Sequence, residues 1–117
     1  MHIINIKRIY LPSEKSDGFR ILVDRLWPRG VSKESARLDL WLKDIAPSTE
    51  LRQWFHTDNG TDKWEVFKGR YLGELKNNAA VDQLKKIMEK SETVTLLFSV
   101  NDETHNHALI LRDFISG

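Results

Sequence analysis

The chain has 117 residues, of which 40% are hydrophobic and 30% are charged, a composition typical of a soluble globular protein. Its 18 basic and 17 acidic side chains give a formal net charge of +1, so no overall charge attracts it to nucleic acid or to a membrane surface. It contains no cysteine, which excludes disulfides, thiol catalysis and thiolate metal sites. We therefore expect residues 1–117 to form one cytoplasmic domain, without a signal peptide or a membrane-spanning segment.

The first part of the chain predicts two strands. Residues 3–10 alternate in part between apolar and polar side chains and include lysine and arginine, which is typical of a strand near a sheet edge. A turn at Asp17-Gly18 precedes a second strand over residues 19–24. Because the connection is too short for a helical crossover, we expect the two strands to be antiparallel or joined by a tight irregular loop.

The next segments contain turn and capping signals. A short helix is expected to begin at Lys33, with Ser32 as its N-cap. Residues 38–45 fit a helical face as well as strand alternation, and we favour a short extended piece. A helix with Ser48 as its cap follows, and residues 57–60 break it.

Apolar side chains at helical spacing predict two further helices, over about residues 61–76 and 79–90. Gly69 and Gly73 lie one turn apart in the first of them, where each costs about 1 kcal/mol relative to alanine. Their placement suggests that a neighbouring element packs closely against this helix.

Residues 93–98 are the clearest strand of the chain, and their apolar run predicts a place in the middle of a sheet. A last helix follows, capped by Asp102 or Thr104, with Ala108 and Leu111 on its inward face. The elements together predict an α/β fold, a small mixed or mostly parallel sheet packed by several helices.

The first candidate site is the segment from Asp24 to Gly30, which follows the second strand. In open α/β sheets, ligands bind beyond the carboxyl ends of the strands. The guanidinium groups of Arg25 and Arg29 suit phosphate or carboxylate, and the Trp27 indole could stack on a planar ligand. The alternative is structural, an Asp–Arg pair that locks the turn with Trp27 buried as an anchor. The two alternatives weigh about equally for the arginines, whereas the structural one is favoured for Trp27.

The second candidate site is His105-Asn106-His107, at the start of the last helix. Histidines at i and i+2 of a helix point about 200° apart, so a two-histidine metal site is disfavoured and no metal is expected. His107 is the better candidate to face a cleft, as a base, an acid or a hydrogen-bond donor. The favoured alternative is a half-buried histidine that ties the helix to a strand. If the strands over 19–24 and 93–98 are neighbours, Arg25 and His107 share one crevice.

Motifs for other ligand classes are absent. The sequence has no phosphate-binding loop, dinucleotide fingerprint or serine-hydrolase elbow, so no cofactor is expected. Ser48 and Ser99 are candidate hydroxyl partners for a ligand, although Ser48 is more simply a helix cap. Basic side chains over residues 63–90 are interspersed with acidic ones, which is typical of a solvated face and disfavours nucleic-acid binding.

Several motifs together resemble a known family. They are DGFR at 17–20, VDRLWPRG at 23–30, WLKDIAPS at 41–48, LR at 51–52 and NHA at 106–108. In this order, and over nearly the whole chain, they resemble the YeaO-like family of small bacterial proteins, which is classed as a domain of unknown function. The resemblance implies a bacterial, cytosolic α/β domain with no assigned activity. Related sequences in the wider group carry cysteines near the last strand and helix, where this chain has none.

We therefore expect a site for a small anion, phosphate or carboxylate, at the strand ends. The candidate catalytic residues are Asp24 and His107, and the candidate ligand-binding residues are Arg25, Trp27, Arg29, Ser48, Ser99 and Asn106. The sequence leaves open whether the site is enzymatic and which oligomeric state the protein adopts. The alternative is a non-catalytic protein-interaction module, which an exposed Trp54 or Trp64 beside an apolar patch would favour. Nucleic-acid binding ranks last.

Overall fold

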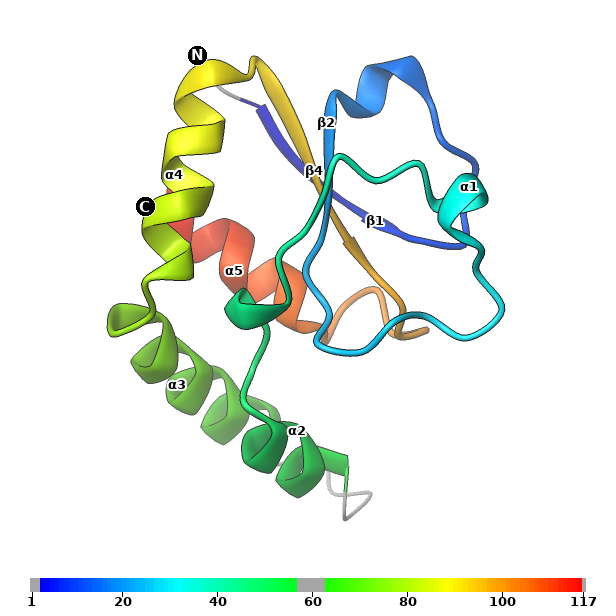
Figure 1. Cartoon of the computed structure of the whole chain (residues 1–117). Helices are drawn as coiled ribbons and strands as arrows, with labels where there is room; N and C mark the ends of the chain where they lie inside the picture. The colour runs from blue at the N-terminus through cyan, green and yellow to red at the C-terminus, as the bar shows by residue number, and fades with distance from the viewer. Residues whose placement is uncertain (1–2, 57–62, 117) are drawn as a thin grey trace.

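A computed structural model describes residues 3–56 and 63–116, and its strands form one sheet (Figure 1). The four strands lie in the order β1-β4-β2-β3, and each neighbouring pair is parallel. Their bounds are Ile3–Arg8 for β1, Phe19–Leu22 for β2, Leu40–Trp41 for β3 and Thr93–Phe98 for β4. The predicted α/β class is confirmed, with β1 at an edge and β4 in the middle as expected.

Helices occupy the segments between the strands. Within the described residues they are α1 Lys33–Ala36, α2 Thr49–His56, α3 Lys63–Lys76, α4 Ala80–Lys90 and α5 His107–Ser116, with 3-10 turns at Lys15–Asp17 (η1) and Lys43–Ile45 (η2). The ambiguous segment over 38–45 thus contains both a short strand and a helical turn. The predicted break at 57–60 lies outside the described residues. Of the helices in the part of the chain that the structure describes, none is both long and apolar enough to cross a membrane.

Of the two alternatives for the N-terminal strands, the antiparallel arrangement is wrong, and the strands are joined by an irregular loop that contains η1. β4 lies between β1 and β2, pairing Ile3 with Thr93 on one side and Phe19 with Val94 on the other, and all three strands run in the same direction. The segment over residues 9–18 can reach about 35 Å when extended, which is enough to return along the short strands and pass one neighbour without a helix. A short connection therefore does not exclude a parallel arrangement here.

The core lies mainly between the sheet and three helices. Along β4 the side chains alternate, so that Val94, Leu96 and Phe98 join the large apolar cluster formed with α3, α4 and α5. Leu97 points to the opposite face and packs with Ala36 of α1 in a smaller cluster. Figure 1 accordingly shows α1 on the opposite side of the sheet from α4. Both faces of β4 are buried, which explains the three consecutive apolar residues at 96–98.

Two of the predicted helix caps are confirmed and one is wrong. Ser32 and Ser48 accept hydrogen bonds from the first turns of α1 and α2. Asn106, rather than Asp102 or Thr104, caps α5, because its Oδ1 accepts a backbone N–H of the first turn at 3.0 Å. The last helix therefore begins later in the chain than the sequence suggested.

The expectation of close packing at the two glycines of α3 is also wrong. A Cβ atom placed on Gly69 or Gly73 would meet no atom within 4 Å. The buried stripe of this helix consists of Phe67, Tyr71 and Leu75. The glycines lie two residues away from members of that stripe, about 200° around the helix, and so face away from the core.

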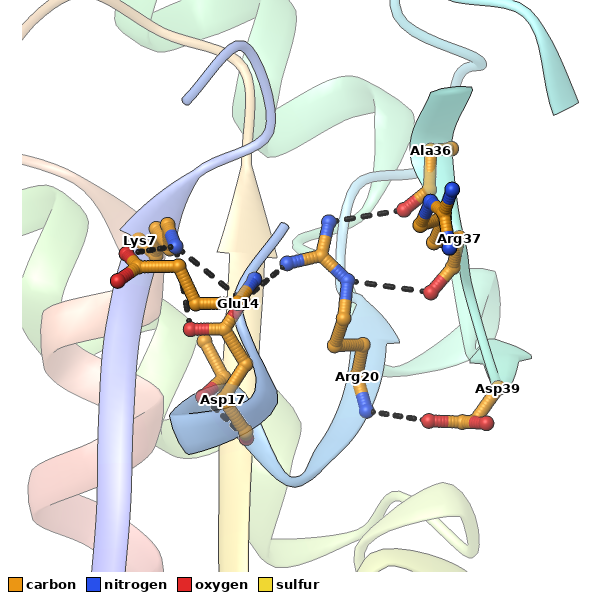
Figure 2. A network of polar contacts seen from close by, with 8 residues as sticks. Lys7, Glu14, Asp17, Arg20, Ala36, Arg37 and Asp39 are labelled. Carbon is orange, nitrogen blue, oxygen red and sulfur yellow. Dashed lines mark hydrogen bonds and ion pairs between the residues drawn. The ribbon is translucent and has the colours of Figure 1, made fainter. Parts of the chain in front are cut away.

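A buried polar network fixes the start of β2 (Figure 2). Asp17 and Arg20, only 6% and 4% exposed, form an ion pair. Arg20 also donates hydrogen bonds to the carbonyls of Ala36 and Arg37, at 2.8 Å and 3.1 Å. Lys7 of β1 donates to Asp17 at 3.1 Å. The network therefore joins β1, η1, β2 and the end of α1.

This network predicts a loss of stability in acid. Burial disfavours the Asp17 carboxylate, but the backbone N–H of Glu14 and the side chains of Lys7 and Arg20 outweigh burial and lower its pKa. A carboxyl group whose pKa is lower in the folded chain stabilises the fold above its unfolded pKa of about 3.9, and this contribution is lost as the pH falls through the folded pKa. The free energy of unfolding should therefore fall below about pH 4, and Asp17→Asn should flatten that fall.

Urea denaturation at a series of pH values measures this effect. Asp113→Asn is the matched control, because Asp113 pairs with Arg112 only at 3.6 Å and its side chain is 68% exposed. The control profile should follow the wild type. An Asp17→Asn profile parallel to that of the wild type would contradict the prediction.

Candidate functional site

A cleft of about 450 Å³ lies beyond the carboxyl ends of β2 and β4. Its lining comes from Tyr10 after β1, residues 24–29 after β2, residues 46–47 before α2, and side chains of α2 and α3. Residues 99, 100, 102 and 105–107, from the end of β4 to the first residue of α5, complete it. This is the edge at which ligands bind in open parallel sheets. Arg25 and His107, from segments far apart in the sequence, both line this one cleft.

Asp24 joins the ends of the two central strands. It is 8% exposed, and its Oδ2 accepts hydrogen bonds from the backbone N–H and the hydroxyl of Ser99, at 3.0 Å and 2.6 Å. Its Oδ1 is buried 3.2 Å from Nε2 of His107, within ion-pair distance, and accepts no hydrogen bond from a described residue. The parallel pairing of β2 with β4 brings Asp24 and Ser99 together, and α5 supplies His107. The carboxylate thus fixes three segments of the cleft relative to one another.

The orientation of His107 follows from its neighbours. Its Nε2 lies 2.9 Å from the carbonyl oxygen of Val23 and 3.2 Å from Oδ1 of Asp24. Both neighbours are acceptors, so Nε2 carries a proton. Within the described residues, Nδ1 has no hydrogen-bond partner. His107 therefore ties α5 to the end of β2 and keeps one ring nitrogen available.

Three arginines line the cleft, and each is held differently. Arg25 donates from Nε to the carbonyl of Pro47 at 3.2 Å and from Nη2 to the carbonyl of Ala46 at 3.1 Å. Arg29 is exposed, and its guanidinium makes no hydrogen bond or ion pair with any residue that the structure describes. Arg52 of α2 has a buried Nε without a hydrogen-bond partner in the described chain. Among the ion pairs between described residues, none involves these three side chains.

The carboxylate of Asp102, also in the cleft, is occupied by its own loop. It accepts hydrogen bonds from the backbone N–H and the hydroxyl of Thr104, each at 2.9 Å, and from the backbone N–H of His105 at 3.0 Å. The Thr104 N–H and hydroxyl, with the backbone N–H of His105, lower the pKa of Asp102. Asp102 therefore stays ionised at neutral pH and remains bound to its loop.

The other sequence-predicted residues are placed as follows. Trp27 lines the cleft, half-buried, with its Nε1 donating to the carbonyl of Val31 at 2.6 Å. Asn106 lines it as well, in its role as the cap of α5. Ser48 is not part of the lining, because its hydroxyl donates to Glu74 of α3 at 2.6 Å.

Sequence reasoning missed several lining residues. His105 was expected to point away from the cleft on a helix, but α5 begins only at His107, and His105 lies in the preceding loop and faces the cleft. Arg52, Phe55 and His56 enter from α2, whose docking position has no local signal in the sequence. In the sequence, only the LR motif at 51–52 indicated that Arg52 could belong to the site.

The indoles named for the interaction hypothesis are half-buried and packed against the core. The ring of Trp54 has the guanidinium of Arg70 at 4.6 Å and the ammonium of Lys63 at 4.9 Å from its centroid. The ring of Trp64 stacks on Phe67 at 5.8 Å. Each indole is therefore partly covered by these contacts and partly open to solvent.

Metal ligation has no support in the described part of the chain, where His, Asp and Glu side chains form no group of three or more able to hold a metal ion. The fold and the cleft thus define a small α/β protein with an all-parallel sheet and an arginine-lined cleft at the carboxyl edge of that sheet.

Comparison with known proteins identifies the family. The model described as "Inactive DUF488-N3 subclade" matches residues 3–117, and the chain belongs to this family of unknown function. It is 46% identical to the uncharacterized protein YeaO of Escherichia coli over 112 residues, which is 96% of each chain. It is 36% identical to the uncharacterized protein Rv3073c of Mycobacterium tuberculosis over 114 residues, which is 97% of this chain and 94% of the other. The resemblance to the YeaO-like family is confirmed. No solved structure matches this chain.

Proposed function

We propose that the cleft binds a small anion, a phosphate or a carboxylate, and that it does so without catalysing a reaction. The observation that carries the proposal is the set of three arginines in one cleft, none of them paired with a described carboxylate. Guanidinium groups are suited to bidentate binding of phosphate and carboxylate. A ligand anion would supply the negatively charged partner that the arginines lack among the described residues.

No described carboxylate lies within ion-pair distance of the three arginines. Asp24 accepts hydrogen bonds from Ser99, and Asp102 accepts them from the loop before α5. Arg25 is held in direction by two backbone carbonyls, which carry no net charge, and it has no carboxylate partner among the described residues. A cation held in place before the ligand arrives binds with a smaller loss of conformational freedom.

Catalysis by Asp24 and His107 is the second candidate function. The free Nδ1 of His107 favours it, because a neutral imidazole nitrogen can accept a proton. Against it, Oδ2 of Asp24 accepts two hydrogen bonds from Ser99, and Oδ1, which has no hydrogen-bond partner among the described residues, is buried beside His107, so neither oxygen is open to a ligand in the cleft. The family description also calls the subclade inactive. We therefore assign Asp24 and His107 a positioning role.

A titration of the full chain with inorganic phosphate and with acetate tests the proposal. Phosphate at about 100 times its dissociation constant should stabilise the wild type by about 2.7 kcal/mol, measured as a rise in melting temperature. Arg29→Ala should abolish this rise while leaving the melting temperature of the free protein nearly unchanged, since the Arg29 side chain is exposed. Arg52→Gln should weaken binding as well.

Arg112→Ala is the matched control, because Arg112 is partly exposed on α5 and lies outside the cleft lining. It should respond to phosphate like the wild type. The proposal fails if neither anion stabilises the wild type, or if Arg29→Ala and Arg112→Ala respond equally.

A further inference from the structure

We propose that the anion of this cleft is a phosphate monoester that carries a planar aromatic ring. This inference rests on the proposed anion site and deepens it, since it names the class of ligand. It is drawn from three features of the cleft: its aromatic lining, its volume and its unpaired charge.

The cleft has aromatic rings on two sides. Tyr10 and Trp27 line it from the loops that follow β1 and β2. Phe55 of α2 and Phe67 of α3 line it from the helices, with ring centroids 4.4 Å apart. Aromatic rings stack favourably on other planar groups, in offset or edge-to-face arrangements. A ligand ring placed in the cleft would therefore find aromatic partners in Tyr10, Trp27 and Phe55, whereas Phe67 is buried in the core.

The volume agrees with a larger ligand. At about 450 Å³ the cleft falls within the range of roughly 300–1,000 Å³ that is typical of pockets for small organic molecules. A free phosphate or acetate ion would fill only a small part of it. The remainder is lined by those aromatic rings and by aliphatic side chains such as Leu26 and Val100, which favours an apolar or planar extension of the anion.

The charge favours phosphate over carboxylate as the anionic group. Arg25, Arg29 and Arg52 are all without a carboxylate partner among the described residues. A phosphate monoester carries about −1.5 to −2 charges at neutral pH and offers three acceptor oxygens. A carboxylate carries one charge and two oxygens. The phosphate therefore meets the available donors more completely.

Tyr10 connects the aromatic and cationic parts of the cleft. Its hydroxyl donates to the backbone carbonyl of Arg29 at 3.0 Å, so its ring lies beside the arginine segment. The guanidinium of Arg8 lies 5.1 Å from the centroid of the Tyr10 ring, and Tyr10 is still 46% exposed. Its open surface is thus available to a ligand ring close to the phosphate-binding segment.

Isothermal titration of the full chain with AMP, ribose 5-phosphate, adenosine and indole-3-acetate tests this inference. AMP should bind at least about tenfold more tightly than ribose 5-phosphate, which lacks the ring, and than adenosine, which lacks the phosphate. AMP should also bind more tightly than indole-3-acetate, which carries a ring and a carboxylate.

Variants at Tyr10 separate the ring contribution from folding. Tyr10→Leu and Tyr10→Phe both lose the hydroxyl that donates to the Arg29 carbonyl, but only Tyr10→Phe keeps the ring. Tyr10→Leu should therefore bind AMP about fivefold or more weakly than Tyr10→Phe does, while the two variants should bind ribose 5-phosphate within about twofold of each other. Arg29→Ala should lose both phosphates.

The outcomes distinguish this inference from the function on which it rests. Equal binding of AMP and ribose 5-phosphate, with both lost in Arg29→Ala, overturns the aromatic ligand and retains the anion site. Tighter binding of indole-3-acetate than of AMP overturns the phosphate. No binding of any anion overturns both proposals.

Discussion

Replacing Arg20 with methionine is expected to lower the free energy of unfolding by about 3 kcal/mol, because it removes one of the two cations that pair with the buried Asp17 carboxylate and leaves only Lys7. Arg20 lies on β2 and is 4% exposed. It forms an ion pair with Asp17 of η1. Its guanidinium also satisfies the carbonyls of Ala36 and Arg37. Methionine fills a similar length but donates no hydrogen bond. The melting temperature should drop by on the order of 10 °C or more.

Chemical denaturation of both proteins measures this loss. Arg112→Met is the matched control at a partly exposed pair, and it should stay within about 0.5 kcal/mol of the wild type. The double variant Asp17→Asn with Arg20→Met should cost less than the sum of the single changes, since either change alone already breaks the pair. A loss below about 1 kcal/mol for Arg20→Met would show that the network contributes little to stability.

Replacing Gly18 with alanine is the second change with a large expected effect, a loss of about 3 kcal/mol or more. Gly18 has a φ of +65° and a ψ of −133°, a conformation that residues with a Cβ rarely adopt. A Cβ here would lie 2.3 Å from the carbonyl oxygen of Thr93 and 2.8 Å from its Cβ. The clash is with the backbone of the central strand, which cannot move without disturbing its pairing on both sides.

Gly73→Ala is the matched comparison, because it makes the same substitution at a site where a Cβ atom has room. An added Cβ at Gly73 meets nothing within 4 Å, and its helical backbone suits alanine. This variant should gain about 0.5 to 1 kcal/mol, because glycine is a poor helix former. Urea denaturation of the two variants should move their midpoints in opposite directions. Equal midpoints would contradict the steric explanation for Gly18.

The local elements of the fold could be predicted from the sequence, but their arrangement could not. Strand β4 and helix α4 follow from apolar periodicity, and Ser32 caps α1 as its chemistry predicts. Strand order depends on pairing between residues far apart in the chain, for which the short loop after β1 gave a misleading signal. Two alternatives for residues 38–45 coexist because a two-residue strand is followed directly by a helical turn.

The site shows the same division. The placement of Asp24, Arg25 and Arg29 at the end of β2 follows from the rule that ligands bind at the carboxyl edge of the sheet. Arg52 was missed because its contribution depends on how α2 docks beside that edge. His105 was misplaced because one residue, Asn106, decides where α5 begins. The residue that caps a helix thus decides where the helix begins and which of the neighbouring side chains face the cleft.

The central position of β4 has a consequence for the order in which the molecule assembles. Ile3 of β1 pairs with Thr93 of β4, and Phe19 of β2 pairs with Val94 of β4. Neither N-terminal strand can therefore form these pairings until β4 has left the ribosome, late in synthesis. A nascent chain that ends before β4 can form helices and the short β2–β3 pairing, but it lacks the strand that joins the sheet. Such high contact order slows folding. The cleft, which opens beyond β4, is therefore among the last features of the protein to form.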